Sequence, residues 1–200
     1  LSDRWFVDDL SAFLADYGVV EAGRANSLAQ TALLLTCPGV ADLYQGTELW
    51  EHSLVDPDNR RPVDYSLRRT LLAKLTGAGV GAGLAEALAL GPEGGPKLWL
   101  VHRLLRLRRE RPEAFSLESG YRALAVDGPK ADHAVAFCRT GGVVAVVPRL
   151  VVGLGGDWAG TTVGLPEGGW TDVFTGNTFG GSVALADLLA GFPVAVLAGR

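Results

Sequence analysis

Methionine is absent from this chain of 200 residues, and cysteine, histidine and lysine are scarce, with two, three and three residues. Because no methionine stands at position 1 or anywhere else, the sequence is predicted to be a portion of a longer protein. Cys37 and Cys138 lie far apart and outside any CxxC or metal-ligand spacing, so we expect two buried free thiols in a reducing cytoplasm. His102 and His133 are interpreted as structural or surface residues, and no metal or other cofactor is expected.

The sequence also lacks long hydrophobic runs and an excess of positive charge. No run of 18 apolar residues occurs, which predicts neither a membrane span nor a signal peptide. The net charge is -4, and the one dense basic run, residues 103–111, falls on a helical pattern whose basic side is interpreted as a solvated face. We therefore expect no nucleic acid and no membrane among the partners. With 48% apolar residues, the chain is instead typical of a globular protein.

Apolar residues at helical spacing dominate the first 112 residues. Gly18 follows the first such pattern as a left-handed helix cap would, Pro38 and Gly39 end the second, and Pro112 ends the last. The predicted helices are Ser2–Tyr17, Glu21–Thr36, Ser66–Leu75, a short helix over Ala82–Leu90, and Lys97–Arg109.

Two segments between these helices have a different pattern. Val40–Tyr44 is apolar, short and bounded by glycine, which predicts a buried strand, and a helix followed by a buried strand is the rhythm of a parallel α/β fold. Glu48–Tyr65 has neither strand nor helix periodicity and predicts a loop. Loops of this length within a compact domain are uncommon and tend to be functional.

Beyond Pro112 the sequence changes to short β-rich runs separated by glycine and proline turns. The predicted strands are Tyr121–Val126, His133–Arg139, Val143–Leu150, Thr161–Leu165, Trp170–Phe174 and Pro193–Leu197. Their spacing is close to that of an antiparallel β-sandwich. The sequence therefore predicts an α+β chain with a domain boundary near Pro112, dividing it into residues 1–112 and 113–200.

The loop concentrates charge of both signs within nine positions. Desolvation and side-chain ordering make such a cluster costly unless something uses it, and sugar hydroxyls are suited to carboxylates, amides and guanidinium groups. Equally, Asp-Pro-Asp-Asn is a good turn sequence, and interleaved Asp and Arg can neutralise one another. The cluster consists of Asp56, Asp58, Asn59, Arg60, Arg61 and Asp64.

Two motifs carry a resemblance to a known family. PGVADLYQGTE, residues 38–48, resembles the motif of the eighth barrel strand in the α-amylase superfamily, with Ala41 where proline is usual. LVDPDNRRPVDY, residues 54–65, is similar nearly letter for letter to a loop of the maltooligosyl trehalose synthases, and the likeness continues over essentially the whole chain. The resemblance implies that residues 1–112 hold the last strand and helices of a truncated (β/α)8 barrel, followed by the sandwich. Loops that follow barrel strands build the active site.

The resemblance also implies an activity. Members of this family convert the reducing-end α-1,4 linkage of a maltodextrin into an α,α-1,1 (trehalose) linkage by intramolecular transfer. By analogy with the family, an aspartate attacks the anomeric carbon to give a covalent glycosyl enzyme, and a glutamic acid protonates the departing glucose, whose anomeric hydroxyl then attacks. The superfamily carries its acidic residues on strands four, five and seven, which are expected on a missing amino-terminal region. We therefore assign no catalytic residue here and expect the chain alone to be inactive. The substrate-binding residues implied are Asp56, Asp58, Asn59, Arg60, Arg61 and Asp64, supported by Tyr44, Gln45 and Glu48.

Two other functions remain open at this point. An α-amylase-like hydrolase would share the strand motif but not the charged loop, and a carbohydrate-binding or interaction module would use the sandwich. Trp158 and Trp170 suit sugar stacking in such a module, but core packing is the commoner use of sandwich tryptophans. One barrel strand cannot close a barrel, so self-association of the chain is a further expectation.

Overall fold

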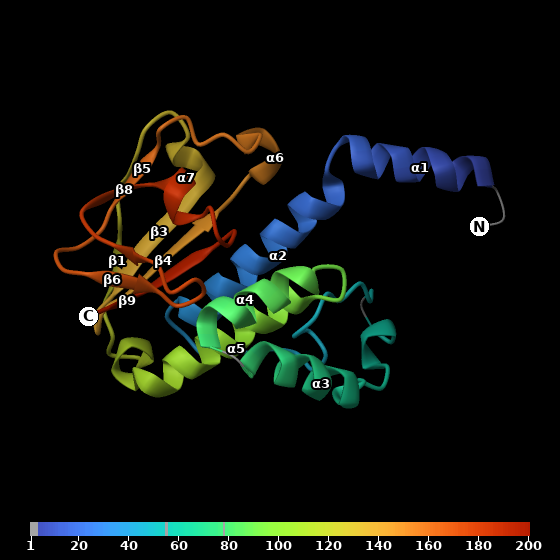
Figure 1. The fold of residues 1–200 in the computed structure, drawn as a ribbon, viewed down its shortest axis with the longest axis horizontal. Helices are drawn as coiled ribbons and strands as arrows, with labels where there is room; N and C mark the ends of the chain where they lie inside the picture. The colour runs from blue at the N-terminus through green and yellow to red at the C-terminus, as the bar shows by residue number, and fades with distance from the viewer. Residues whose placement is uncertain (1–3, 55, 78) are drawn as a thin grey trace.

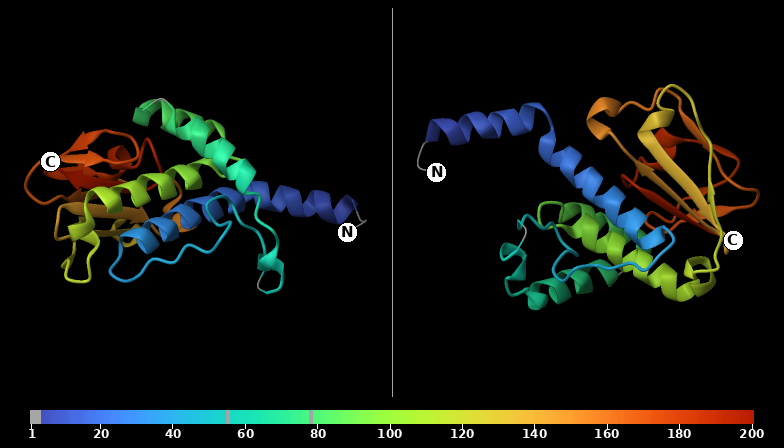
Figure 2. Two further views of the ribbon diagram at one scale, coloured as in Figure 1. Left: turned by 90° about the horizontal axis from the view of Figure 1, so that it is seen from below. Right: turned by 180° about the vertical axis from the view of Figure 1, so that it is seen from behind.

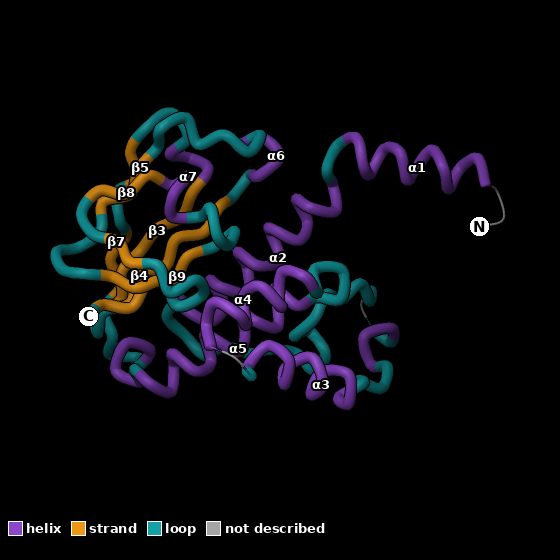
Figure 3. Tube along the Cα trace, in the orientation of Figure 1, coloured by secondary structure: helices purple, strands orange, loops and turns teal. Residues whose placement is uncertain are grey.

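The computed structural model describes residues 4–54, 56–77 and 79–200. Helices fill the first half of the chain and strands the second, as Figure 3 shows by colour. The long helices are α1 (Arg4–Asp16), α2 (Val19–Thr36), α3 (Tyr65–Thr76), α4 (Gly79–Ala89) and α5 (Gly95–Glu110). All five were predicted from apolar spacing, although Ser2, the predicted start of the first, lies outside the described residues.

Capping and helix-breaking residues set where these helices begin and end. Gly18 has φ 57° and ψ 32°, the left-handed conformation predicted for it, and it separates α1 from α2. Asp64 caps α3 by accepting a hydrogen bond from the Leu67 amide at 2.9 Å. Pro112 follows the end of α5 and opens a short 3-10 helix, Pro112–Phe115.

The strands form two antiparallel sheets. The larger has the order β1-β3-β4-β9-β6-β7, and the smaller has the order β2-β5-β8. Their bounds are β1 (Tyr121–Ala123), β2 (Val126–Asp127), β3 (Ala134–Arg139), β4 (Val143–Pro148), β5 (Thr162–Gly164), β6 (Trp170–Asp172), β7 (Thr178–Phe179), β8 (Ser182–Ala184) and β9 (Ala195–Gly199). Short helices α6 (Val151–Leu154) and α7 (Leu185–Leu188) lie between them, and two further 3-10 helices are Asp58–Arg60 and Ala131–His133.

Strand β4 lies between two hydrophobic cores and contributes to both, because its side chains alternate between the two faces of the sheet. Val143, Ala145 and Val147 pack toward α2 and α5, whereas Val144 and Val146 pack toward the smaller sheet. Figure 1 shows the large sheet beside α2, with α3, α4 and α5 grouped below. Both faces of β4 are thus covered, which explains its unbroken apolar sequence.

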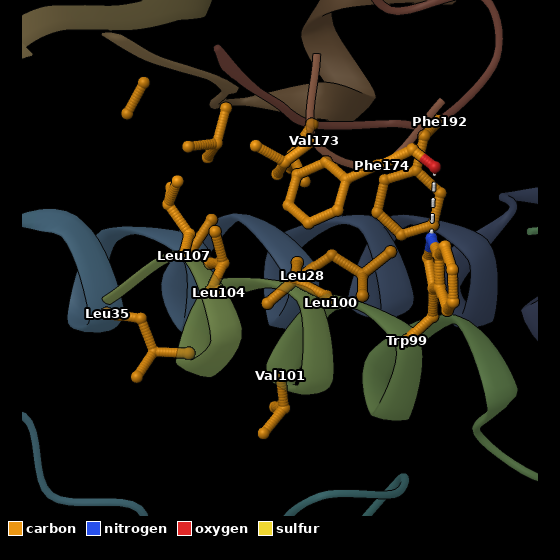
Figure 4. Close-up of a cluster of buried hydrophobic side chains, with 14 of the residues drawn as sticks. Leu28, Leu35, Trp99, Leu100, Val101, Leu104, Leu107, Val173, Phe174 and Phe192 are labelled. Carbon is orange, nitrogen blue, oxygen red and sulfur yellow. Dashed lines mark hydrogen bonds between the residues drawn. The ribbon is translucent and has the colours of Figure 1, made fainter. Parts of the chain in front are cut away.

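The first core joins helices to the sheet. Figure 4 shows Trp99 and Leu104 of α5 and Leu28 of α2 beneath Phe174 and Val173, with the Trp99 indole Nε1 donating to the Phe174 carbonyl oxygen at 3.3 Å. The helical and sheet regions therefore share one hydrophobic cluster.

The predicted buried strand over residues 40–44 is wrong. The structure assigns no strand there, and Val40 is 91% exposed. A strand needs a hydrogen-bonded neighbour, and every strand in the described residues begins after residue 120. The segment instead runs as an irregular connection from α2 to the charged loop.

Helix α1 projects away from the body of the molecule (Figures 1 and 2). None of its described residues is buried, and Trp5, Phe13 and the adjoining Tyr17 are exposed. Among the described residues, no helix is both long enough and apolar enough to cross a membrane. Cys37 and Cys138 are free and half-buried, and burial raises the pKa of both thiols.

Candidate functional site

The charged loop starts from a tight turn at residues 44–47. The Thr47 amide and hydroxyl both donate to the Tyr44 carbonyl oxygen, at 3.1 and 2.6 Å. Gly46 has φ 90°, and a Cβ there would approach the Val63 side chain to 3.2 Å. Glycine therefore allows this turn to lie against the far end of the loop, so that the two ends of the loop meet.

Arg68 fastens those two ends together. Its guanidinium donates to the Glu48 carboxylate at 3.0 Å, to the Gly46 carbonyl oxygen at 2.5 Å and to the Asp64 carbonyl oxygen at 3.1 Å. Its side chain is 16% exposed, so these bonds are partly shielded from water. The sequence prediction missed Arg68, since only its position four residues after Asp64 on a helix hinted at a role there.

At the tip of the loop the charges form two ion pairs. Arg60 pairs with Asp56, with Nε donating to Oδ1 at 2.8 Å, and Arg61 pairs with Asp58. The hydrogen bonds that Arg60 donates to the Asp56 carboxylate raise the pKa of Arg60. Asp58 also accepts a hydrogen bond from the Leu54 amide at 2.8 Å, which orients the 3-10 turn. The tip therefore presents carboxylates and guanidinium groups in a defined arrangement.

Asn59 lies between Asp58 and Arg60 in the sequence and, unlike them, carries no charge. Its side-chain oxygen is buried but has no hydrogen-bond partner among the residues that the structure describes. Buried acceptors are normally satisfied, and an unsatisfied one costs roughly 1–3 kcal/mol. The Asn59 side chain is therefore held at the tip by the fold of the loop and not by a hydrogen bond from its oxygen to a described residue.

The structure brings five of the predicted substrate-binding residues together at the loop tip and places the other four where the two ends of the loop meet. The loop tip holds Asp56, Asp58, Asn59, Arg60 and Arg61. The remaining four have other positions: the Asp64 carboxylate caps α3, Glu48 binds Arg68, and the exposed Tyr44 and Gln45 lie on the turn.

The two sandwich tryptophans belong to the second core. Trp158 and Trp170 are buried, and the Trp170 indole donates to the Pro166 carbonyl oxygen at 2.9 Å. Core packing, the commoner use considered above, accounts for both. Within the described ranges no three His, Cys, Asp or Glu side chains converge as metal ligands would.

Comparisons with known proteins agree on one family. A curated protein of Mycobacterium tuberculosis strain H37Rv, named "Putative maltooligosyl trehalose synthase", is 42% identical over 175 residues, which are 87% of this chain and 20% of that protein. The solved maltooligosyltrehalose synthase of Arthrobacter ramosus is 38% identical, with a TM-score of 0.84 over 99% of this chain and 25% of that one. A solved glycosyltrehalose synthase of strain DSM5389 is 27% identical, with a TM-score of 0.72 over all of this chain and 23% of that one.

No family model matches the chain. The chain spans about a fifth of the length of the curated relatives it matches. The similarity in sequence and in fold nevertheless extends over most or all of its residues, and the region matched is the carboxy-terminal portion of those longer proteins. This chain therefore belongs to the maltooligosyl trehalose synthase family.

Proposed function

We propose that the chain is the carboxy-terminal part of an enzyme that converts the reducing-end α-1,4 linkage of maltodextrins into an α,α-1,1 linkage by intramolecular transglycosylation. The observation that carries this proposal is the match to the Arthrobacter ramosus synthase, with a TM-score of 0.84 over 99% of the chain. Within that enzyme, residues 1–112 would complete a (β/α)8 barrel, in which residues 40–44 would pair with strand neighbours that this chain does not contain. Residues 113–200 would form the β-sandwich domain.

The catalytic carboxylates are proposed to lie on polypeptide outside this chain. A retaining mechanism needs two carboxyl groups about 5 Å apart that are free to act on the substrate. At the loop tip, Asp56 and Asp58 are each paired with an arginine, which supports a binding role over a nucleophilic one. By this proposal the chain alone forms no trehalose from maltodextrins.

The loop tip is proposed to hold the terminal glucose while it is turned. The Arg60 and Asp56 side chains are 69% and 55% exposed, and exposed ion pairs contribute little to stability, so they exchange readily for ligand contacts. Carboxylate and guanidinium groups bind sugar hydroxyls as acceptors and donors.

Replacement of Arg60 by alanine in the full-length enzyme tests this role. We expect the trehalose-forming rate to fall about tenfold, the value of one charged hydrogen bond, and the share of released glucose to rise. The measurement is trehalose-ended product and free glucose from maltopentaose. Arg149→Ala, an exposed arginine beyond β4, is the matched control. If Arg60→Ala leaves both products unchanged, the loop does not hold the glucose.

A further inference from the structure

A polar hollow of about 360 Å³ lies between the end of α3, the start of α4 and the middle of α5. Figure 1 shows these three helices grouped together below the large sheet. The ionisable side chains that line the hollow all belong to α5, and they are His102, Arg103, Arg106 and Glu110. No residue of the charged loop lines it, so the hollow is separate from the candidate site.

Arg103 is anchored at one edge of its guanidinium group. Its Nε donates to the Val173 carbonyl oxygen at 2.7 Å, and its guanidinium carbon lies 5.3 Å from the centre of the Trp99 ring. The two terminal nitrogens bind no acceptor among the residues that the structure describes, and they are not enclosed by protein. Arg103 therefore presents two open donors from a fixed position, an arrangement suited to an oxyanion.

Arg106 lies three residues further along α5, on the same side of the helix. Its Nε donates to the Glu110 carboxylate at 2.7 Å, and the two side chains are 58% and 55% exposed. Glu110 offsets one of the two arginine charges in the hollow. Exposed ion pairs of this kind contribute little to stability, so Arg106 is free to turn from Glu110 to a ligand.

The pKa of His102 indicates a positive potential in the hollow. Burial lowers this pKa, and repulsion from Arg103, Arg106 and Arg109 lowers it further. The charged groups that shift the pKa are thus all arginines, in a chain whose net charge is -4. Interaction with the helix dipole does not account for Arg103, which lies about two turns before the end of α5.

The start of α4 adds backbone donors. Gly79 and Val80 line the hollow and are the first two residues of this 11-residue helix. The first amides of a helix have no intrahelical acceptor, and they carry the positive end of the helix dipole. Guanidinium groups together with such amides form a common donor set for phosphate oxygens.

We propose that this hollow binds a phosphate group, with Arg103, Arg106 and the first amides of α4 donating to its oxygens. A phosphate group has three strong acceptor oxygens, one for each of these three sets of donors. A free phosphate ion and a small phosphate monoester share this chemistry. The site goes beyond the proposed function and does not depend on it.

The chain has only three histidines, which provide a reporter and two internal controls. In the 200-residue chain at constant ionic strength, inorganic phosphate should shift the imidazole NMR signals of His102 saturably. It should also raise the pKa of His102, because the bound dianion offsets the repulsion from the arginines. His52 and His133 lie outside the hollow, and their signals should not move. An unmoved His102 signal would overturn the proposal, and so would equal shifts of all three histidines.

Arg106→Gln should weaken phosphate binding about tenfold, because it removes one charged donor. The Arg106 side chain is exposed, so this variant should remain folded. Arg69→Gln is the matched control, since Arg69 is an exposed arginine of α3 outside the hollow. If the two variants bind phosphate equally well, Arg106 is not a ligand and the proposed donor set is wrong.

Glycerol 3-phosphate distinguishes the two sources of the phosphate group. Tighter binding of glycerol 3-phosphate than of inorganic phosphate would support a monoester as the ligand, and weaker binding would support the free ion. Glycerol alone should leave the His102 signal in place. A saturable shift with glycerol equal to that with glycerol 3-phosphate would overturn the assignment to a phosphate group.

Discussion

The sheet region and the helical region bury their apolar residues in different ways. In the sheet region, β4 and β9 have covered faces on both sides, and most side chains of those strands are enclosed. In the helical region, α1 and the segment after α2 leave large apolar residues in contact with solvent, Trp5 and Val40 among them. Close packing on all sides holds buried side chains in single conformations, whereas exposed apolar area marks surfaces suited to contact with other molecules. The predicted self-association would use the helical surface.

The largest effect should come from Trp99, where the two regions meet. Trp99 is 2% exposed, and Trp99→Ala should lower the free energy of unfolding by about 3–5 kcal/mol. Because the first core is shared, we expect a single unfolding transition when circular dichroism and tryptophan fluorescence are followed in denaturant. Trp5→Ala is the control, since Trp5 is 74% exposed and its loss should cost less than about 0.5 kcal/mol.

Two separate unfolding transitions would contradict the expectation of a single one. They would indicate that the predicted division near Pro112 separates independently stable units. A loss of less than about 1 kcal/mol in Trp99→Ala would likewise contradict a shared core that depends on this side chain.

A smaller effect is expected at Arg139, a buried arginine of β3 that ties the sheet to the helices. Its guanidinium donates to the carbonyl oxygens of Thr36 at 3.0 Å, Ser116 at 3.3 Å and Ser119 at 3.4 Å. Arg139→Met leaves these acceptors without their donor and should cost roughly 1.5–3 kcal/mol in denaturant unfolding. Arg122→Met, at an exposed position of β1, should change stability little. If both variants lose the same free energy of unfolding, the buried hydrogen bonds of Arg139 do not account for the loss.

The smallest expected effect is a pH dependence from His102 in α5. Burial, with added repulsion from Arg103, Arg106 and Arg109, lowers the pKa of His102 in the folded chain. The unfolded chain keeps a histidine pKa of about 6.5, so below that pH it binds the proton first and the free energy of unfolding decreases. The decrease should level off once the pH passes the folded pKa.

Denaturant unfolding from about pH 7.5 to about pH 5 measures this slope. His102→Gln should reduce it, whereas His52→Gln, at an exposed position, should not. An unchanged slope in His102→Gln would mean that other groups set the pH dependence.

Much of the helical region was predictable because each helix carries its own local signals. Apolar spacing, Gly18 and Pro112 located the five long helices to within a few residues at most ends. The longer strands, β3 and β4, were also predicted from local signals, since each is a short and mainly apolar run bounded by polar or turn residues.

The failures depended on partners distant in sequence. Val40–Tyr44 has the composition of a buried strand, but strand structure requires a neighbour, which composition does not supply. Strands β7 and β8 are two and three residues long and too short to show periodicity. Each is defined by pairing, β7 with β6 and β8 with β5.

In the candidate site, too, local features were predictable from the sequence and contacts between distant residues were not. The charge of the loop, and the residue types at its tip, follow directly from the sequence. The bond between Arg68 and Glu48 joins residues 20 positions apart, and the bond between Arg68 and the Gly46 carbonyl oxygen joins residues 22 positions apart. Neither could be inferred without the fold, because no local spacing places these side chains together.

The alternation of β4 has a consequence for how the protein tolerates change. Val144 and Ala145 are neighbours in the chain, yet one belongs to the layer beneath the small sheet and the other to the layer above the helices. Inserting or deleting one residue upstream in this strand would move every following side chain into the opposite layer. Length variation among natural relatives should therefore be confined to the turns on either side of β4, while substitutions within it remain limited by the volume available on each face.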